Sequence, residues 1–450
     1  MIDTIRNAWK IIDLRKKILY TILMIIIFRL GSCIPVPLLD PAAMKEIFTS
    51  DNSLFGFIDV ISGGAFQNAT IFAMSITPYI NSSIIMQLLT VAIPALERLQ
   101  KQGEDGRKKI AQITRYGTVV LAFIQAIGLY FMLKSYNAVT NPGLLTAVVV
   151  IFTFTAGTAF LMWLGEQITE FGIGNGISII LFAGIVSRFP HMVSDVYHGV
   201  TAWMDPLTQE EFTAMNWSEA QIAAYQKSLL APWMVAVVIL GMLALVVFIV
   251  FISNAERRLP VQYAKRVVGR KMYGGQSTHI PMKVNMSGVL PIIFAQSIAS
   301  LPATICAFVP KWQNGWVMKH IFDTTTWPYI VIYFLLIIFF SYFYSTIQFN
   351  PIEVANNLKK NGGFIPGFRA GKPTSEFIQK VLNKITLFGA IYLSVIAITP
   401  LIISACSKAE QLTGISLGGT SIIIVVGVAL ETVRALEAQM LMRNYKGFLN

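Results

Sequence analysis

Apolar stretches long enough to cross a lipid bilayer recur along this chain, and they constrain its fold more than any other feature. About 20 helical residues, rising roughly 1.5 Å each, cover the hydrocarbon core of a membrane. The chain is 55% hydrophobic and only 13% charged, whereas a soluble domain carries about 25% charged residues. We therefore predict an all-α polytopic membrane protein with ten transmembrane helices. The expected spans are Ile18–Pro35, Ile71–Ala92, Tyr116–Leu133, Leu144–Leu164, Ile173–Val186, Trp233–Ile252, Val289–Val309, Tyr329–Ile347, Ile385–Ile403 and Thr420–Leu430.

The basic residues indicate how these spans are oriented. If the N-terminus is cytoplasmic, the loops on that side hold 27 of the 35 lysines and arginines, but only 12 of the 23 acidic residues. An excess of Lys and Arg, rather than of net charge, marks the cytoplasmic side of a membrane protein. The formal charge of +12 therefore reflects topology and contact with anionic lipids, and we expect both termini to be cytoplasmic.

Ten spans divide into two halves of five, and an odd number inverts the second half relative to the first. The second span of each half carries a matching break, at Thr77-Pro78 and at Leu290-Pro291. The fifth spans have matching glycine-rich entries, Gly172–Gly176 and Gly414–Gly419. Interrupted segments at corresponding positions of inverted repeats indicate a transport path at the interface of the halves, although Pro and Gly are common in membrane helices. The expected division is an amphipathic N-terminus (1–17), the first half (18–186), an outer hinge loop (187–231), the second half (232–442) and a cytoplasmic tail (443–450).

A short apolar segment precedes the second span. Leu54–Phe66 is too short to cross a bilayer and is interrupted by Gly63-Gly64, so we expect a pore stopper there. The broken spans also carry neutral polar side chains at depth, which predict a seam that can part; the alternative is ordinary hydrogen bonding between helices. These side chains are Asn81, Ser82, Ser83, Gln87, Gln125, Gln296 and Ser297.

Two cytoplasmic loops, 254–288 and 348–384, are long and strongly basic. Loops of this length without structure of their own are uncommon, so we expect ordered fingers that reach into the cytosol. Their charge suits RNA phosphates, anionic lipid or an acidic protein. A simpler alternative is that they only fix the topology.

Catalytic and metal-binding patterns are missing from the sequence, so we expect neither an enzyme nor a cofactor. The four histidines are scattered, and Arg29 is the clear charge inside a span. Ion-coupled carriers keep ionisable groups at depth, which argues against a small-solute transporter. The remaining alternative, a membrane enzyme or a lipid flippase, would need a catalytic or metal-binding cluster.

Several long motifs resemble one family. These are SITPYINSSIIMQLL, QGEDGRKKIAQITRYGT, FLMWLGEQITEFGIGNGISI, QSTHIPMKVNMSGVLPIIFA, FNPIEVANNLKKNGGFIPGFRAGKPTSEFI and GGTSIIIVV. From about Asp13 to Asn444 the chain resembles the SecY family, the large subunits of the bacterial protein-translocation channel. The resemblance implies two five-span halves around a central pore, a plug at about 55–70 and a gate that opens sideways to lipid. Unfolded secretory polypeptides would cross the plasma membrane through the pore, driven by an external motor or a ribosome.

The resemblance also assigns roles to residues. The pore ring would be Ile76, Ile80, Leu181, Ile293 and Ile424, where Leu181 replaces the family's usual isoleucine. The plug would include Phe55, Phe57, Ile58, Val60, Ile61, Gly63 and Gly64, and the lateral gate Asn81, Gln87, Gln125 and Asn285. Motor or ribosome binding would use Arg257, Arg258, Arg270, Lys271 and Arg369. The implied partners are SecE, SecG, the SecA motor, the ribosome, signal sequences and nascent polypeptides, and anionic lipids, with no nucleic acid other than ribosomal RNA.

Overall fold

The computed structural model describes residues 2–40, 63–205, 231–263, 266–268, 271–273, 277–286, 288–308, 315, 320–321, 326–406 and 418–446. Within these ranges the first half of the chain forms α1 (Ile2–Lys10), α2 (Ile12–Gly31), α5 (Thr77–Ala92), α6 (Pro94–Lys101), α7 (Glu104–Ser135), α8 (Leu144–Phe171), α9 (Gly176–Ser187) and α10 (Phe189–Met204). The second half forms α13 (Pro232–Asn254), α14 (Leu290–Phe308), α16 (Trp327–Gln348), α17 (Pro351–Lys360), α18 (Lys372–Cys406) and α20 (Gly418–Lys446). Its strands are β1 (Glu256–Tyr263), β2 (Arg266–Val268), β3 (Lys271–Tyr273), β4 (Ser277–Lys283) and β5 (Gly363–Phe364).

Each predicted span overlaps a helix of the structure. Within the described ranges, six helical runs are long and apolar enough to cross a membrane: Glu104–Ser135, Leu144–Phe171, Gly176–Met204, Pro232–Asn254, Trp327–Lys360 and Lys372–Thr399. The pair α5 and α6, bent by 99° at Ile93, passes the same test when it is taken together. The chain is therefore a helical, multi-pass membrane protein.

Three details differ from the sequence prediction. The second span begins at Thr77 rather than bending there, because Pro78 lies in the first turn of α5, where a helix needs no amide proton from it. The fifth span, expected to end at Val186, continues through α10 to Met204. The expected cytoplasmic loop 165–172 lies mostly within α8, which ends at Phe171. The helices are moreover joined by a small amount of β structure.

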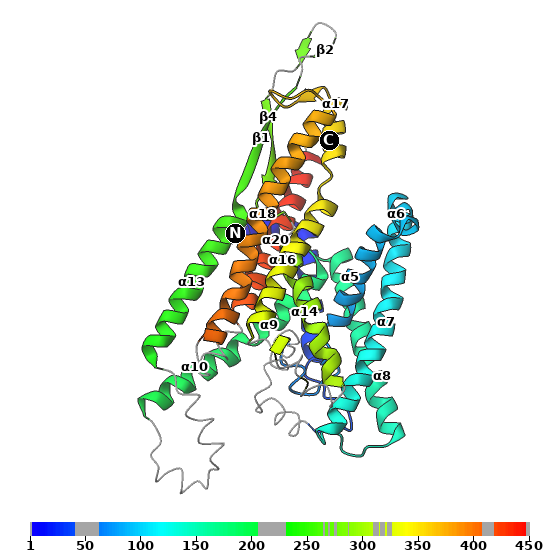
Figure 1. Ribbon diagram of the computed structural model, residues 1–450, viewed down its shortest axis with the longest axis vertical. Helices are drawn as coiled ribbons and strands as arrows, with labels where there is room; N and C mark the ends of the chain where they lie inside the picture. The colour runs from blue at the N-terminus through cyan, green and yellow to red at the C-terminus, as the bar shows by residue number, and fades with distance from the viewer. Residues whose placement is uncertain are drawn as a thin grey trace.

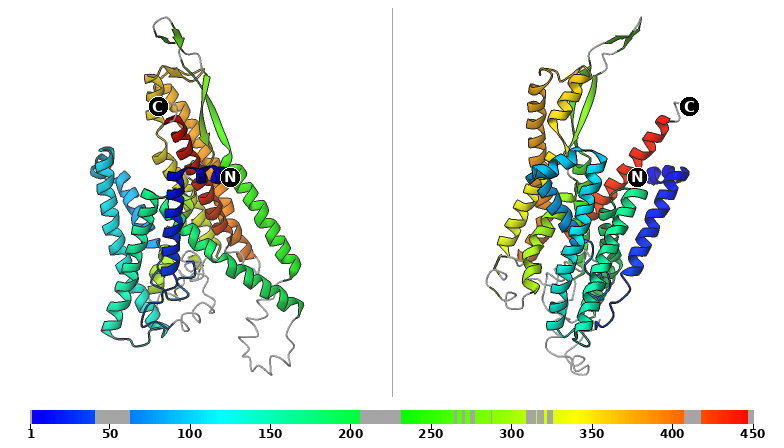
Figure 2. Two further views of the ribbon diagram at one scale, coloured as in Figure 1. Left: turned by 180° about the vertical axis from the view of Figure 1, so that it is seen from behind. Right: turned by 90° about the vertical axis from the view of Figure 1, so that its right-hand side faces the viewer.

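The helices form a bundle with an extension at one end (Figure 1). Helices α5, α7 and α8 lie on one side of the bundle, and α13, α16, α18 and α20 lie on the other (Figures 1 and 2). Between these groups, α14 packs against α5, α7 and α16. Both termini lie toward the end of the bundle from which β1 and β4 project (Figure 2), in agreement with the expectation that they share a side.

The two basic loops fold into one body. Strand β1 pairs antiparallel with β4, from Glu256 opposite Lys283 to Gln262 opposite Ser277. The second loop contributes β5, which adds to the other edge of β1. Under the sheet lies an apolar cluster drawn from both loops and from the first turns of α18: Leu259, Val261, Met282, Leu358, Ile365, Ile378 and Leu382. We call this unit the cytoplasmic body, after the side on which the sequence predicts these loops to lie. The two loops that were expected to form ordered fingers share one sheet and one apolar core.

Candidate pore collar, seam and cytoplasmic body

All five predicted pore-ring residues lie in or against one large apolar cluster that both halves of the chain share. Ile76, Ile80, Leu181 and Ile293 are buried members of a single apolar cluster. Ile424 is half-buried and packs against that cluster. We call these five residues the collar. They come from α9, α14, α20, the start of α5 and the residue that precedes it, so both halves of the chain contribute.

Two of the collar residues lie at the starts of helices. Ile76 directly precedes α5, and Ile293 lies in the first turn of α14. Helix α8 packs against the collar at Gly165, where a Cβ would lie 3.5 Å from the Cδ1 atom of Ile76, an ordinary contact distance. A ring of aliphatic side chains offers no hydrogen bond to a passing chain and dewets readily, so it can close a pore to ions without selecting a sequence.

Only the end of the predicted plug lies within the described residues. Phe55, Phe57, Ile58, Val60 and Ile61 fall outside them. Gly63 and Gly64 form a turn and have φ angles of +68° and +84°, a backbone region that favours glycine. Residues 63–76 then run through consecutive turns and bridges to the start of α5.

A polar contact crosses the expected seam between the halves. The Tyr344 hydroxyl of α16 donates a hydrogen bond to the Gln87 side-chain oxygen of α5. The Gln87 amide nitrogen in turn lies 3.4 Å from the Ser83 hydroxyl. The Tyr344 ring also packs on Phe294 of α14, with ring centroids 5.0 Å apart. The sequence predicted Gln87 as a gate residue but not Tyr344, because nothing in the sequence distinguishes one aromatic residue of an apolar span from the others.

The other predicted gate residues have different surroundings. Asn81 is buried in α5, and its side-chain oxygen has no hydrogen-bond partner among the described residues. Gln125 is half-buried on α7. Asn285 lines a small pocket together with Ser341, Ser345 and Thr386 of α16 and α18, and within the described part of the chain its oxygen has no partner either. Asn285 thus packs within the second half, and of the four predicted gate residues, only Gln87 makes a described hydrogen bond across the seam.

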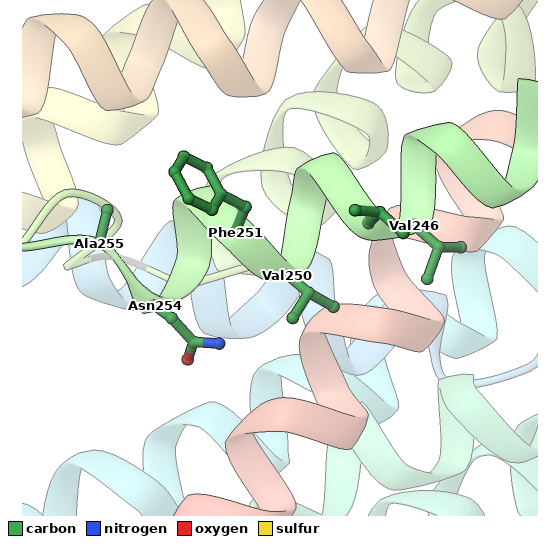
Figure 3. Close-up of a pocket in the computed structure, with 6 residues that line it drawn as sticks. Val246, Val250, Phe251, Asn254 and Ala255 are labelled. Carbon is green, nitrogen blue, oxygen red and sulfur yellow. The ribbon is translucent and has the colours of Figure 1, made fainter.

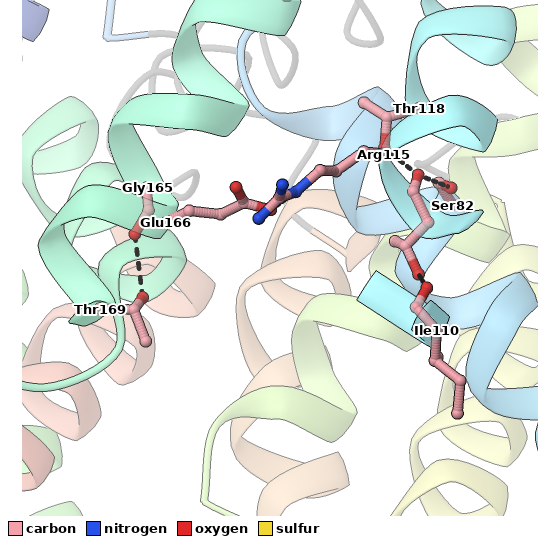
Figure 4. Close-up of polar contacts among 8 residues, drawn as sticks. Ser82, Ile110, Arg115, Thr118, Gly165, Glu166 and Thr169 are labelled. Atoms are coloured by element: carbon pink, nitrogen blue, oxygen red, sulfur yellow. Dashed lines mark hydrogen bonds and ion pairs between the residues drawn. The ribbon is translucent and has the colours of Figure 1, made fainter. Parts of the chain in front are cut away.

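Within the first half, polar contacts tie α5, α7 and α8 together (Figure 4). The Ser82 hydroxyl donates to the Thr114 carbonyl at 2.9 Å. The Arg115 Nε atom lies 2.9 Å from a Glu166 carboxylate oxygen and forms an ion pair between α7 and α8. These contacts make α5, α7 and α8 one side of the seam that can move as a unit.

The predicted partner-binding residues belong to the cytoplasmic body. Arg257 and Arg258 are exposed on β1, where Arg258 pairs with Glu256 at 2.7 Å. Arg369 is exposed in the turn between β5 and α18. Its carbonyl accepts a 2.7 Å hydrogen bond from Thr374, and Phe368 stacks on Phe377 beside it. Lys271 lies in β3, whereas Arg270 falls outside the described residues.

Most of the apolar surface of α13 is exposed, as far as the described residues show. Its buried residues are Ile249, Ile252 and Ser253, near its end, while residues such as Val247 and Phe251 are exposed. An open apolar groove lies at this end, lined by Val246, Val247, Val250, Phe251, Asn254 and Ala255 (Figure 3). Beside it, Arg434 of α20 donates to the Ser253 carbonyl and the Asn254 side chain, each at 2.7 Å.

One ionisable group at the base of the cytoplasmic body has a shifted pKa. Partial burial and the nearby Arg434 guanidinium lower the pKa of Lys283, while Glu256 and Glu431 act in the opposite direction. Among the described residues, no group of three or more His, Cys, Asp or Glu side chains gathers at a site that could hold a metal ion.

Comparisons with known proteins agree with this arrangement. Among solved structures, the chain is similar to one described as a protein-conducting channel, with a TM-score of 0.60 and 15% identity, covering 95% of this chain and 92% of that chain. It is also similar to Sec61 in a canine ribosome–channel complex from the endoplasmic reticulum, with a TM-score of 0.57 and 14% identity, covering 95% and 92%. At these identities the likeness concerns the fold.

The sequence comparisons are more specific. The chain is 44% identical over 465 residues to the protein translocase subunit SecY of Streptomyces scabiei, and 42% identical over 459 residues to that of Bacillus subtilis, each covering 100% of both chains. Residues 70–433 match the SecY family model. The chain therefore belongs to the SecY family.

Proposed function

We propose that this chain is a passive protein-conducting channel that moves unfolded secretory polypeptides across the bacterial plasma membrane and releases apolar segments sideways into lipid. The collar is the observation that carries this proposal, because five aliphatic residues from both halves converge in one apolar cluster. Such a constriction has no binding preference for a particular side chain. The chain is a translocase subunit and not an enzyme, so the driving force comes from outside.

The lateral gate is the seam of α5 and α7 against α14 and α16. A signal sequence that enters this seam meets lipid on one side, and each buried methylene contributes about 0.8 kcal/mol to its partition. The Gln87–Tyr344 hydrogen bond and the packing of α14 on α5 and α7 hold the seam closed. Asn81, Gln125 and Asn285 supply further polar groups near these helices.

The segment at about 55–70 is the plug, which would seal the pore on the outer side of the collar. Deleting it should raise the ion conductance of resting channels in planar bilayers. Unchanged conductance would contradict a sealing role.

The cytoplasmic body is the docking surface for the SecA motor or the ribosome. Its exposed arginines, Arg257, Arg258 and Arg369, support this role, because guanidinium groups bind carboxylates and phosphates with two hydrogen bonds. SecE and SecG are the proposed membrane partners, and the exposed face of α13 offers room for a partner helix. In this arrangement both termini are cytoplasmic.

A photo-crosslinking residue at Ile293 tests the path. The full chain, with an arrested secretory precursor, should crosslink through this position to the mature part of the precursor, and only when the signal sequence is functional. The matched control places the same residue at Phe251, on the outer surface of α13, and should give no such crosslink. Crosslinking at Phe251 but not at Ile293 would place the path outside the collar.

A further inference from the structure

Arg29 makes a contact that the channel proposal does not use. It lies in the last turn of α2, which ends at Gly31, and so it sits near the outer end of the first span rather than in its middle. Its Nη1 atom donates a 3.0 Å hydrogen bond to the Gly63 carbonyl. Hydrogen bonds from a charged donor are about twice as strong as neutral ones.

Gly63 is held from the other side by α9. Its φ of +68° suits glycine, and a Cβ there would lie 2.8 Å from the Gly184 carbonyl oxygen and 2.8 Å from the Ser187 hydroxyl. The Ser187 hydroxyl lies 3.4 Å from the Gly63 carbonyl but only 2.6 Å from that of Gly184. The single hydroxyl proton of Ser187 is therefore donated to the Gly184 carbonyl. Among the described residues, Arg29 is then the principal donor to the Gly63 carbonyl.

The chain that follows Gly63 leads directly to the collar. Its backbone is bonded to the residues after α2, with Val36 N to Ala69 O at 2.8 Å and Ile71 N to Ile34 O at 3.1 Å. Phe72 then stacks on Phe28 of α2, with ring centroids 6.1 Å apart. The segment ends at Ile76, which is fully buried in the collar. Residues 63–76 thus carry a pore-ring residue without being helical themselves.

We propose that Arg29 is a positioning residue of the closed channel. By bonding the Gly63 carbonyl it fixes residues 63–76 between α2 and α9, and thereby holds Ile76 in the collar. All three elements belong to the first half of the chain, so the segment stays with that half when the seam opens. This inference rests on the collar being the constriction of the pore.

Two simpler explanations of Arg29 involve only its charge. The guanidinium would interact favourably with the C-terminal end of α2, where cations are stabilised, or it would bind lipid headgroups. Neither role involves Gly63. A change at Gly63 that leaves every charge in place therefore separates the two explanations.

The experiment measures ion efflux from proteoliposomes that contain equal amounts of full-length resting channel, for Arg29→Gln, Gly63→Ala and the double variant. Lys134→Gln is the matched control, since it removes a positive charge from an exposed side chain near the end of α7. Ile293→Ser, a direct change in the collar, reports whether the collar seals the pore at all.

We expect Arg29→Gln and Gly63→Ala each to raise efflux about tenfold, which corresponds to about 1.4 kcal/mol in the closed-to-open equilibrium. The double variant should leak no more than the larger single effect, because both changes displace the same segment. Arg29→Gln removes the charged donor to the Gly63 carbonyl, and Gly63→Ala places a Cβ 2.8 Å from the Gly184 carbonyl oxygen. Lys134→Gln should match the parent protein.

Two results would overturn the inference while leaving the channel proposal intact. In the first, Ile293→Ser leaks but Arg29→Gln does not. In the second, Arg29→Gln raises ion efflux while Gly63→Ala does not, which would assign the effect to the loss of the Arg29 charge. If Ile293→Ser also stays tight, the collar itself is wrong, and this inference fails with it.

Discussion

At the scale of single residues, the seam depends on a contact between one amide and one phenol. Tyr344 is buried, and its hydroxyl reaches Gln87 on the opposite side of the seam. A typical hydrogen bond contributes about 1 kcal/mol net, and an unpaired buried partner costs about 1–3 kcal/mol. A single such bond is strong enough to bias the gate and weak enough for a signal sequence to displace.

Tyr344→Phe should therefore loosen the gate. We expect about a fivefold gain in the translocation of a precursor whose signal sequence has a shortened apolar core, since about 1 kcal/mol shifts an equilibrium by roughly that factor. Reconstituted vesicles with a labelled precursor give the measurement. The control is Tyr342→Phe on the same helix, whose hydroxyl bonds to the Asn383 carbonyl instead. Equal translocation rates for the wild type, Tyr344→Phe and Tyr342→Phe would contradict a role of Tyr344 in holding the seam closed.

The stability of the cytoplasmic body should depend on pH through Lys283. Its pKa is lowered by burial and by Arg434, so the folded protein releases this proton at a lower pH than the unfolded chain. Stability then rises with pH between the lowered value and about 10.4, the ordinary lysine pKa.

Thermal unfolding of the wild type and Lys283→Gln checks this expectation. The wild type should gain stability relative to the variant as the pH approaches about 10.4, whereas Lys359→Gln, at an exposed lysine of α17, should show no such trend. Parallel curves for the wild type and Lys283→Gln would contradict the pKa shift.

At the scale of elements, the two basic loops act as one body because their apolar residues share a core. Ile378 and Leu382 of α18 pack against Leu259 and Val261 of β1, and β5 adds to the edge of β1. The exposed arginines of both loops therefore keep fixed positions relative to each other, as a docking surface requires.

Arg369→Glu should lower motor-driven translocation at least tenfold, because reversing a charge at a docking surface replaces attraction with repulsion. Membrane insertion and thermal stability should stay unchanged, since only the Arg369 carbonyl is bonded within the chain by a described hydrogen bond. Translocation assays with the purified motor give the measurement, and Lys134→Glu, near the end of α7 and outside the cytoplasmic body, is the charge-matched control. Normal translocation by Arg369→Glu would exclude a docking role for this residue.

At the scale of the whole molecule, the channel consists of two units that meet along the seam. Helices α5, α7 and α8 are tied by Ser82 and by the Arg115–Glu166 ion pair. Helices α16 and α18 are tied by the Ser345–Thr386 hydrogen bond at 2.8 Å. These contacts hold each unit together, whereas the described side-chain hydrogen bond between the units at the seam is that of Tyr344 with Gln87.

Joining the units should block transport. Gln87→Cys with Tyr344→Cys, in a chain whose three native cysteines are replaced, can be linked by a short bifunctional maleimide. We expect translocation to stop after linking. The control pair, Tyr342→Cys with Asn383→Cys, links α16 to α18 inside one unit and should remain active. Continued translocation through the linked seam would show that the halves need not part.

The sequence alone predicted a helical, multi-pass membrane fold, which the apolar helices and the SecY relatives confirm, and a cytoplasmic location of both termini, which stays a prediction. Those features follow from local quantities, namely the length of an apolar run and the excess of Lys and Arg in a loop. The two basic loops were likewise predicted from their length and charge, whereas the pore-ring residues were named only because long motifs resemble a known family.

Which residues meet depends on tertiary packing. The sequence did not predict Tyr344 as the partner of Gln87, or the pocket that Asn285 shares with α16 and α18, because a sequence pattern reports the face of a helix and not its neighbour. The bond from Arg29 to Gly63 and the shared core of the two basic loops likewise join residues far apart in the chain. Such contacts depend on how helices cross and where backbone breaks fall, and these are set by packing over the whole bundle.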